Sequence, residues 1–154
     1  MTTTLTMSDL EGAGERELGA SDWVEITQEQ VNQFADATGD HQWIHVDPEA
    51  ARNGPFGGPI AHGYLTLSLL PQLMPQVMTI SDAVMGVNYG VEKVRFTNPV
   101  PVGSRVRLHA TLKGSEPKGP GRLNRIGVQM EIEGQEKPAM VGEVLFMAFG
   151  APDA

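Results

Sequence analysis

The chain has 154 residues, the size of a single domain, and 37 of them are Leu, Ile, Val or Phe, enough for a packed core, which excludes wholesale disorder. It has no cysteine, which excludes disulfides, thiolate nucleophiles and zinc–thiolate sites. Its net charge of −8 argues against a general nucleic-acid binder.

No apolar run is long enough to span a bilayer, and the first 15 residues lack the basic and apolar segments of a secretory signal. We therefore expect a cytoplasmic protein that does not insert into membranes. The charge is uneven: residues 1–51 hold eleven acidic side chains and one arginine, whereas residues 93–125 hold eight basic side chains and one glutamate. The basic segment is either a docking surface for an anionic ligand or an ordinary solvated face of strands.

The first 21 residues indicate a weak helix around 8–18 or a loose arm, ahead of a single domain over residues 22–150. The alternation of polar and apolar residues over 22–26 predicts a short strand. Two segments with helix-capping residues follow this strand.

Thr27 followed by Gln30 matches a capping box, in which Gln30 reaches back to the helix start, and Gly39 stands where a left-handed residue ends a helix. A helix is therefore predicted over 27–38, with a polar loop over 40–45. Asp47 followed by Pro48 marks the start of a second, short helix.

Residues 60–78 are apolar in nearly every direction around a helical wheel, which is typical of a buried helix. Pro71 removes a helical hydrogen bond, so the regular part is expected to end near Leu70. Strands are predicted at 84–89, 92–96, 105–112, 125–133 and 139–149. An α+β fold follows, in which a curved antiparallel sheet wraps one buried helix.

Residues 39–47 place two acids and two histidines close together. Asp40 and His45 could hold one water between them as an acid–base pair. The alternative is structural: Asp40 accepts backbone hydrogen bonds after the helix and His45 is a core histidine. Trp43 is expected to supply an apolar wall, whereas Asp47 is explained as a helix cap.

A metal site is the third interpretation of this cluster, but the HxxxH spacing of His41 and His45 falls in loop-to-strand sequence, where it does not place both rings on one helical face. We expect no metal. His41 is expected to face solvent, and His109 is most simply a surface residue.

Gly63 opens the buried helix, where its backbone N–H lies at the positive end of the helix dipole. An oxygen that develops negative charge during a reaction would be stabilised there. The alternative is that close packing between helix and strand requires a glycine at this position.

Three segments carry a family resemblance: GDHQWIHVDP, PIAHGYLTLSLLP and YGVEKVRFTNPVPVGSRV. The first two resemble the hydratase-2 motif of MaoC-like dehydratases and R-specific enoyl-CoA hydratases, especially the nodulation-protein-N-like branch. The third is similar to the two strands and turn that follow the family's central helix. The resemblance runs from Trp23 to Phe149.

The resemblance implies a hot-dog fold and a homodimer with active sites near the subunit interface. It implies Asp40 and His45 as the catalytic dyad and Gly63 N–H as the oxyanion donor, with no metal or other cofactor. Gln42 and Arg95 are added as candidate substrate-binding residues. The chain departs from many relatives in having Gln42-Trp43 where they have Asn-Pro.

The implied reaction is reversible syn-hydration of trans-2-enoyl-CoA to R-3-hydroxyacyl-CoA. The alternatives are an acyl-CoA thioesterase of the same fold and a non-catalytic acyl-CoA-binding module. The basic segment is then expected to bind the CoA phosphates through one or more of its arginines, at positions 95, 105, 107, 122 and 125.

Overall fold

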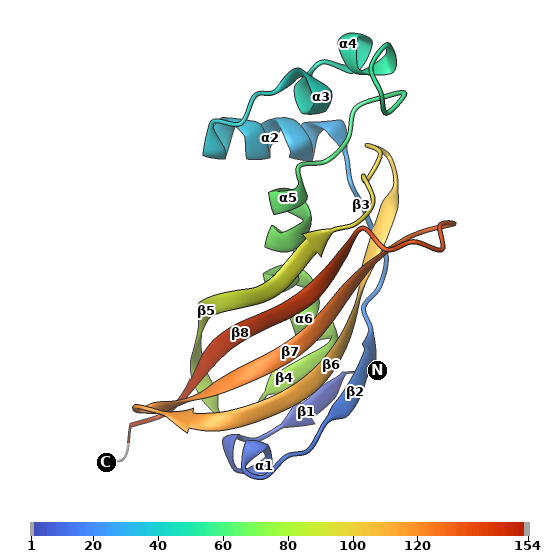
Figure 1. Cartoon of the computed structure of the whole chain (residues 1–154). Coiled ribbons are helices and arrows are strands. Elements are labelled where there is room, and N and C mark those ends of the chain that lie inside the picture. Colours follow the sequence, from blue (N-terminus) through green and yellow to red (C-terminus); the bar gives the residue numbers. More distant parts are fainter. Residues whose placement is uncertain (1, 153–154) are drawn as a thin grey trace.

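The computed structural model describes residues 2–152 of the chain. Its elements, labelled in Figure 1, are β1(Thr3–Leu5), α1(Met7–Leu10), β2(Arg16–Ala20), β3(Val24–Glu25), α2(Gln28–Thr38), α3(Trp43–Val46), α4(Pro48–Arg52), α5(Gly63–Ser68), α6(Leu70–Val77), β4(Met78–Ile80), β5(Ala83–Phe96), β6(Arg105–Lys118), β7(Gly121–Ile132) and β8(Met140–Gly150).

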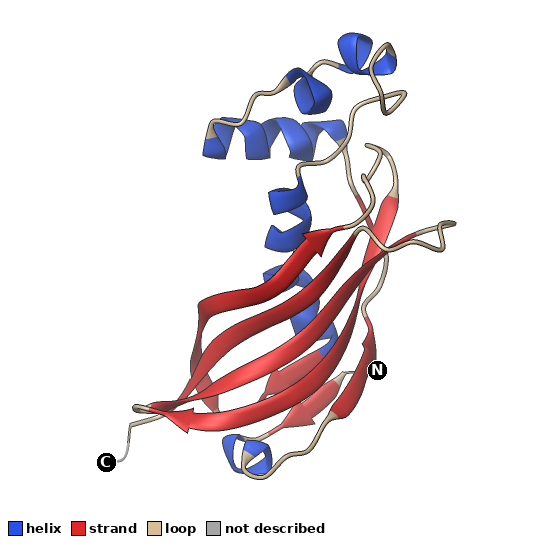
Figure 2. Cartoon of the chain, in the orientation of Figure 1, coloured by secondary structure: helices blue, strands red, loops and turns tan. Residues whose placement is uncertain are grey.

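A curved sheet in the order β2-β6-β7-β8-β5 forms one layer, and all its pairs are antiparallel. β3 also pairs with β6, and β1 and β4 form a separate parallel pair. The helices α5 and α6 lie behind this sheet, while α2, α3 and α4 gather beyond one end of it (Figures 1 and 2). This is the helix-in-sheet arrangement predicted from the sequence.

The helix α2 forms where its capping residues predict. Thr27 accepts a hydrogen bond from Gln30 N at 3.1 Å, and Gly39 ends the helix with a φ of 84°. Gln30 does not reach back to close a capping box, because its side-chain oxygen is buried without a hydrogen-bond partner. Val31 and Ala35 bury the apolar face of the helix.

The central helix continues beyond its predicted end. It pauses at Leu69 and resumes as α6 through Val77. Pro71 is tolerated because it lies in the first turn of α6, where a backbone N–H has no helical partner. The helix is also not dry on every face, since Tyr64, at 70% exposure, and Pro75 are exposed. The sheet therefore covers one side of the helix and leaves the other open.

The two strands predicted before and after residue 90 are one strand, β5. Bulges between Asn88 and Gly90 and between Glu92 and Arg95 absorb the irregularity that the sequence pattern suggested as a break. At the second bulge Lys93 takes a left-handed conformation, with a φ of 52°. The strand stays continuous because β8 pairs with it along its length.

The N-terminal segment differs from its predicted helix or loose arm. Of the described residues in this segment, 7–10 are helical, and residues 16–20 form β2, which pairs with β6 and buries Leu18. The long-range pairing partner, rather than local sequence, decides this conformation. Among the described residues, no helix has the length and apolar character needed to cross a bilayer.

Candidate active site

The two proposed catalytic side chains follow α2 directly. Gly39 turns the chain with its left-handed conformation, and Asp40 comes next, with its side chain exposed. His45 lies in α3, a one-turn helix where the sequence predicts a loop, so that prediction is wrong. The hydrogen bond from His45 N to Gln42 O, at 3.0 Å, helps to close this turn.

His45 is buried, with 6% of its surface exposed, and is held from two sides. Its Nδ1 lies 2.7 Å from the carbonyl oxygen of Ile60, and Gln28 donates from Nε2 to the His45 carbonyl at 2.8 Å. A carbonyl oxygen can only accept, so Nδ1 carries a hydrogen. In the neutral ring, Nε2 therefore keeps its lone pair for chemistry.

A second buried histidine, His62, stands beside His45 and was not singled out by the sequence analysis. It is 2% exposed, and its ring stacks on that of His45 with 4.0 Å between centroids. Its Nε2 lies 2.9 Å from the carbonyl oxygen of Asp40. Because 22 residues separate the hydrogen-bonded pair, no local spacing signals the contact.

Asp40, His45 and His62 bring one possible ligand atom each within 4.8 Å of one another. The lone pair of an imidazole nitrogen lies in the plane of its ring, and the two rings are inclined by only 24°. Because the rings stack with 4.0 Å between centroids, their in-plane lone pairs lie in two separate planes and do not converge on one ion. The geometry therefore favours proton transfer over metal binding.

Gly63 is the first residue of α5, and its N–H has no acceptor within the helix. The alternative explanation of this glycine also has support. A Cβ on Gly63 would lie 2.8 Å from Cδ2 of Phe96 in β5, closer than side chains approach one another. Close packing with Phe96 thus requires a glycine whether or not the N–H binds substrate.

The other residues around the dyad have mostly local roles. Asp47 caps α4 as predicted, accepting from Ala50 N at 3.1 Å. Trp43 does not form the expected apolar wall: it is 44% exposed and covers Gly54. His41 faces solvent as expected.

The candidate substrate residues Gln42 and Arg95 lie in different places. Gln42 donates its backbone N–H to Asp40 Oδ1 at 3.3 Å, and it is exposed. Arg95 precedes Phe96 in β5, and successive side chains of a strand point to opposite faces. Arg95 therefore lies on the face of β5 away from Gly63, and its guanidinium donates to the carbonyl of Val94, its one hydrogen-bond acceptor among residues 2–152.

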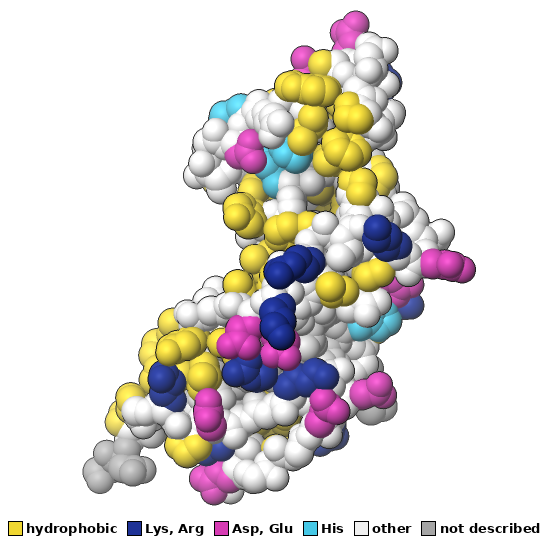
Figure 3. Space-filling model, viewed as in Figure 1, with side chains coloured by type: hydrophobic (Ala, Val, Ile, Leu, Met, Phe, Trp, Pro, Cys, Tyr) yellow, Lys and Arg dark blue, Asp and Glu magenta, His cyan; other side chains and the backbone are white. Residues whose placement is uncertain are grey.

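Within the described structure, four of the eight basic side chains of the segment 93–125 form ion pairs with carboxylates, including Lys113 with Glu15. Arg107 of β6 donates to Glu131 of the neighbouring strand β7, and Arg105 donates to Glu133, just after that strand. Arg125 of β7 contacts Glu143 of the neighbouring strand β8 and, beyond it, Glu92 of β5. The two Glu partners raise the pKa of Arg125. Arg122 binds Ser115. Figure 3 shows acidic and basic side chains interspersed on one face of the molecule.

His109 is a partly exposed residue of β6, in line with the predicted surface position, and it is hydrogen-bonded to a neighbouring strand. Its Nε2 lies 2.6 Å from Glu131 Oε1, and Arg107 Nε lies 2.7 Å from the same oxygen. These hydrogen bonds, first from His109 and then from Arg107, lower the pKa of Glu131. The guanidinium of Arg107 also lies over the ring of Trp23 at 4.3 Å.

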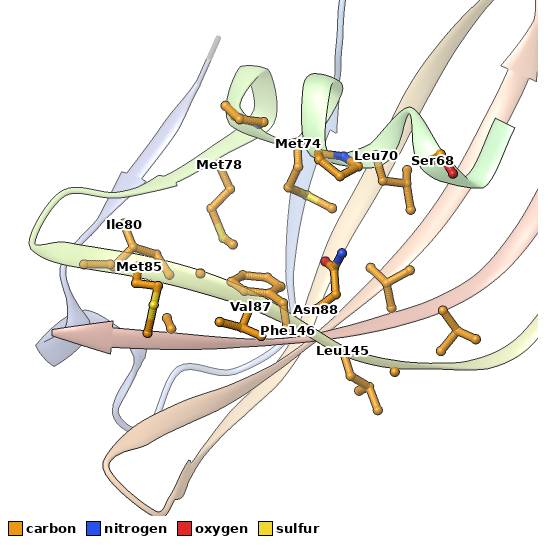
Figure 4. Close-up of a pocket in the computed structure, with 18 of the residues that line it drawn as sticks. Ser68, Leu70, Met74, Met78, Ile80, Met85, Val87, Asn88, Leu145 and Phe146 are labelled. Carbon is orange, nitrogen blue, oxygen red and sulfur yellow. The ribbon is translucent and has the colours of Figure 1, made fainter. Parts of the chain in front are cut away.

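An apolar cavity of about 800 Å³ lies between the central helix and the strands β5 and β8. Figure 4 shows the side chains that line it, among them Leu70, Met74, Met78, Met85 and Phe146. Leu67 and Ser68, which also line it, lie about one helical turn after Gly63. The cavity therefore begins close to the first turn of α5.

Comparison with known proteins identifies the family and the fold. Residues 9–133 match the family model described as the MaoC like domain. The chain is 54% identical over 144 residues to 3-hydroxyacyl-thioester dehydratase Z of Mycobacterium tuberculosis, covering 93% of this chain and 95% of that protein. It is 45% identical over 142 residues to nodulation protein N of Rhizobium leguminosarum bv. viciae, covering 88% and 86%.

Solved structures share the fold. An unliganded R-hydratase from Pseudomonas aeruginosa superposes with a TM-score of 0.74 at 23% identity, covering 96% of this chain and 87% of that one. A monoamine oxidase regulatory protein from Archaeoglobus fulgidus reaches 0.78 at 20% identity, covering 99% of both. The hot-dog fold is thereby confirmed. The chain belongs to the MaoC-like dehydratase family and is a hydro-lyase.

Proposed function

We propose that this protein catalyses the reversible syn-hydration of trans-2-enoyl-CoA to R-3-hydroxyacyl-CoA. The observation that carries the proposal is the placement of the Asp40 carboxylate within 4.8 Å of a nitrogen of His45, near the start of the helix that Gly63 opens. The similarity to a mycobacterial 3-hydroxyacyl-thioester dehydratase supports the same substrate class.

Asp40 and His45 would bind one water between them. With Nδ1 of His45 donating to Ile60, both Nε2 and the carboxylate are proton acceptors. One of them takes a proton from the water as its oxygen bonds to C3 and the C2–C3 double bond opens. Since neither group starts with a proton to give, the proton that reaches C2 is the one that the water lost, which accounts for addition to one face.

The remaining parts of the substrate have matching surroundings. The N–H of Gly63 would donate to the thioester oxygen as negative charge develops there. The cavity between the central helix and the strands β5 and β8 would take the acyl chain, because its lining side chains other than Ser68 and Asn88 are apolar. The reaction needs no metal or redox cofactor.

We further infer that the protein is a homodimer that forms through β5. This strand pairs with β8 along one edge, and its other edge has no partner within the described chain. Its apolar side chains are exposed, including Val84 at 65% and Val91 at 52%. A second copy would cover this edge and the open side of the central helix. A cytoplasmic location fits such an enzyme.

The decisive experiment uses purified protein with crotonyl-CoA. We expect absorbance of the conjugated thioester to fall and chiral analysis to give the R-3-hydroxy product, with no free thiol released. Free CoA would identify a thioesterase instead. Binding of the ester with neither reaction would identify a non-catalytic acyl-CoA module.

A further inference from the structure

His62 makes contacts that connect the parts of the candidate site. Its ring stacks on His45 at 4.0 Å and also touches Phe34 of α2, with 4.9 Å between centroids. Its Nε2 reaches the carbonyl oxygen of Asp40 at 2.9 Å. It also directly precedes Gly63, as the residue before the first turn of α5.

The surroundings of His62 fix its protonation. The carbonyl of Asp40 accepts a hydrogen bond, so the hydrogen of the ring is on Nε2. Nδ1 is buried and has no hydrogen-bond partner. A charged ring would place a second N–H there without an acceptor, which is costly in a buried site. His62 is therefore neutral, and it donates to Asp40 rather than exchanging protons.

This hydrogen bond has a specific mechanical consequence. Asp40 lies in the short connection between α2 and α3, and its side chain is exposed, so packing does not fix it. Within residues 2–152, the bond from His62 is the one that ties the Asp40 backbone to the start of the central helix. The separation between Asp40 and His45 thus depends on His62.

We propose that His62 is a positioning residue of this active site: its Nε2–H holds Asp40 by the backbone, and its ring holds the plane of His45. The proposal rests on the proposed hydratase function, because it assigns the Asp40–His45 pair as the group being aligned. A misalignment of about 1 Å is enough to cost on the order of 10²-fold in rate.

Three variants separate the hydrogen bond from the packing. His62→Phe keeps an aromatic ring between Phe34 and His45 but loses the N–H, whereas His62→Gln places an amide N–H near the position of Nε2. We expect kcat for crotonyl-CoA to fall about 10- to 100-fold in His62→Phe, with KM changed less than about twofold. His62→Gln should recover most of that loss. His41→Gln, in the same connection but solvent-exposed, is the matched control and should retain full activity.

Wild-type kcat in His62→Phe would overturn the proposal. Equal losses of kcat in the Phe and Gln variants, with a raised KM, would also overturn it, because the ring would then matter only for packing. Both of these kcat comparisons require that the parent enzyme is active. An inactive parent would instead reject the hydratase function.

A measurement on the unmodified protein tests the proton placement without any turnover. Nitrogen-15 NMR of histidine-labelled protein should show one buried histidine as the neutral Nε2–H tautomer and a second, His45, with hydrogen on Nδ1. The His62→Gln variant assigns the first signal by its disappearance. A His62 signal with hydrogen on Nδ1, or on both nitrogens at neutral pH, would contradict the proposal even if the enzyme is active.

Discussion

The aromatic ring of Phe96 occupies the space that a side chain on Gly63 would need. An added Cβ would lie 2.8 Å from Phe96 Cδ2 and 2.9 Å from Cγ. Any replacement of Gly63 therefore disturbs packing and activity together, and a simple loss of activity would not identify the oxyanion donor. The role of Gly63 N–H as oxyanion donor can be separated from close packing against Phe96 only in a protein that lacks the Phe96 ring.

In a Phe96→Ala background, Gly63→Ala keeps the backbone N–H and Gly63→Pro removes it. Proline suits this position, because Gly63 is the first helical residue and His62 has the extended conformation that a residue before proline prefers, with φ −59° and ψ 137°. We expect kcat to be about 10²-fold or more lower in the Pro variant than in the Ala variant at similar melting temperature. Equal rates would mean that the thioester oxygen is held elsewhere.

The dyad makes a second prediction. Asp40→Asn should lower kcat by at least ~10²-fold without lowering the melting temperature, because the carboxylate is exposed and has one long hydrogen bond, from Gln42 N at 3.3 Å. Asp36 is an exposed carboxylate near the end of α2, the helix that precedes Asp40. Asp36→Asn is therefore the control and should leave kcat unchanged. Near-normal turnover in Asp40→Asn would reject its catalytic role.

For His45 the informative variant is His45→Asn. The asparagine amide can take the place of Nδ1 toward the carbonyl of Ile60, while nothing replaces Nε2. We expect a loss of kcat of at least ~10²-fold with the fold retained, as measured by steady-state kinetics and circular dichroism. If the variant unfolds instead, the structural interpretation of His45 gains support.

Among the arginines expected to bind the CoA phosphates, those that already pair with carboxylates are weaker candidates than those that do not. Arg95 has no carboxylate partner among the described residues, whereas Arg105 pairs with Glu133. Arg95→Ala should raise KM for crotonyl-CoA several-fold, more than it lowers kcat, and the effect should shrink at high salt. Arg105→Ala should change KM little. Both variants should behave like the parent on a crotonyl-pantetheine thioester, and a loss on that substrate would mean that Arg95 acts on the fold or the dyad.

The lowered pKa of Glu131 predicts a pH-dependent contribution to stability. A carboxylate whose pKa is lowered in the folded state stabilises the folded protein at pH values above the pKa that it has in the unfolded chain. This stabilisation is lost as the pH falls through the pKa of the folded state. Glu131→Gln should therefore lower the free energy of unfolding at pH 7 by roughly 1 kcal/mol, which corresponds to a melting temperature about 2–4 °C lower. In strong acid the substitution should have no effect on the melting temperature. Glu133→Gln, in a more exposed pair, should cost less. Equal curves for Glu131→Gln and parent at pH 7 would contradict this.

The dimer is tested at the free edge of the sheet. Val91→Lys puts a charge on the exposed edge strand β5 and should halve the mass measured by light scattering, because a buried unpaired charge opposes association. Glu17→Lys changes an exposed residue on β2, at the opposite edge of the sheet, and should leave the measured mass unchanged. A monomeric parent would reject the interface.

Local signals in the sequence determined the parts of the fold that depend on neighbours three or four residues away. Thr27 and Gly39 bound α2, and Asp47 caps α4, because each cap bonds to backbone groups within its own first or last turn. The motif that holds Asp40 and His45 likewise located the candidate pair, since only five residues separate them in the chain, whereas Gly63 follows Asp40 by 23 residues.

Only the tertiary structure decided which distant groups meet. The contact of His62 with Asp40 spans 22 residues, and the pairing of Arg107 with Glu131 spans 24 and depends on the register of β6 and β7. The sequence shows an excess of basic residues in 93–125, but the carboxylates that pair with half of them in the described structure lie outside that segment. Such pairings follow from strand register, which long-range burial sets and local spacing does not encode.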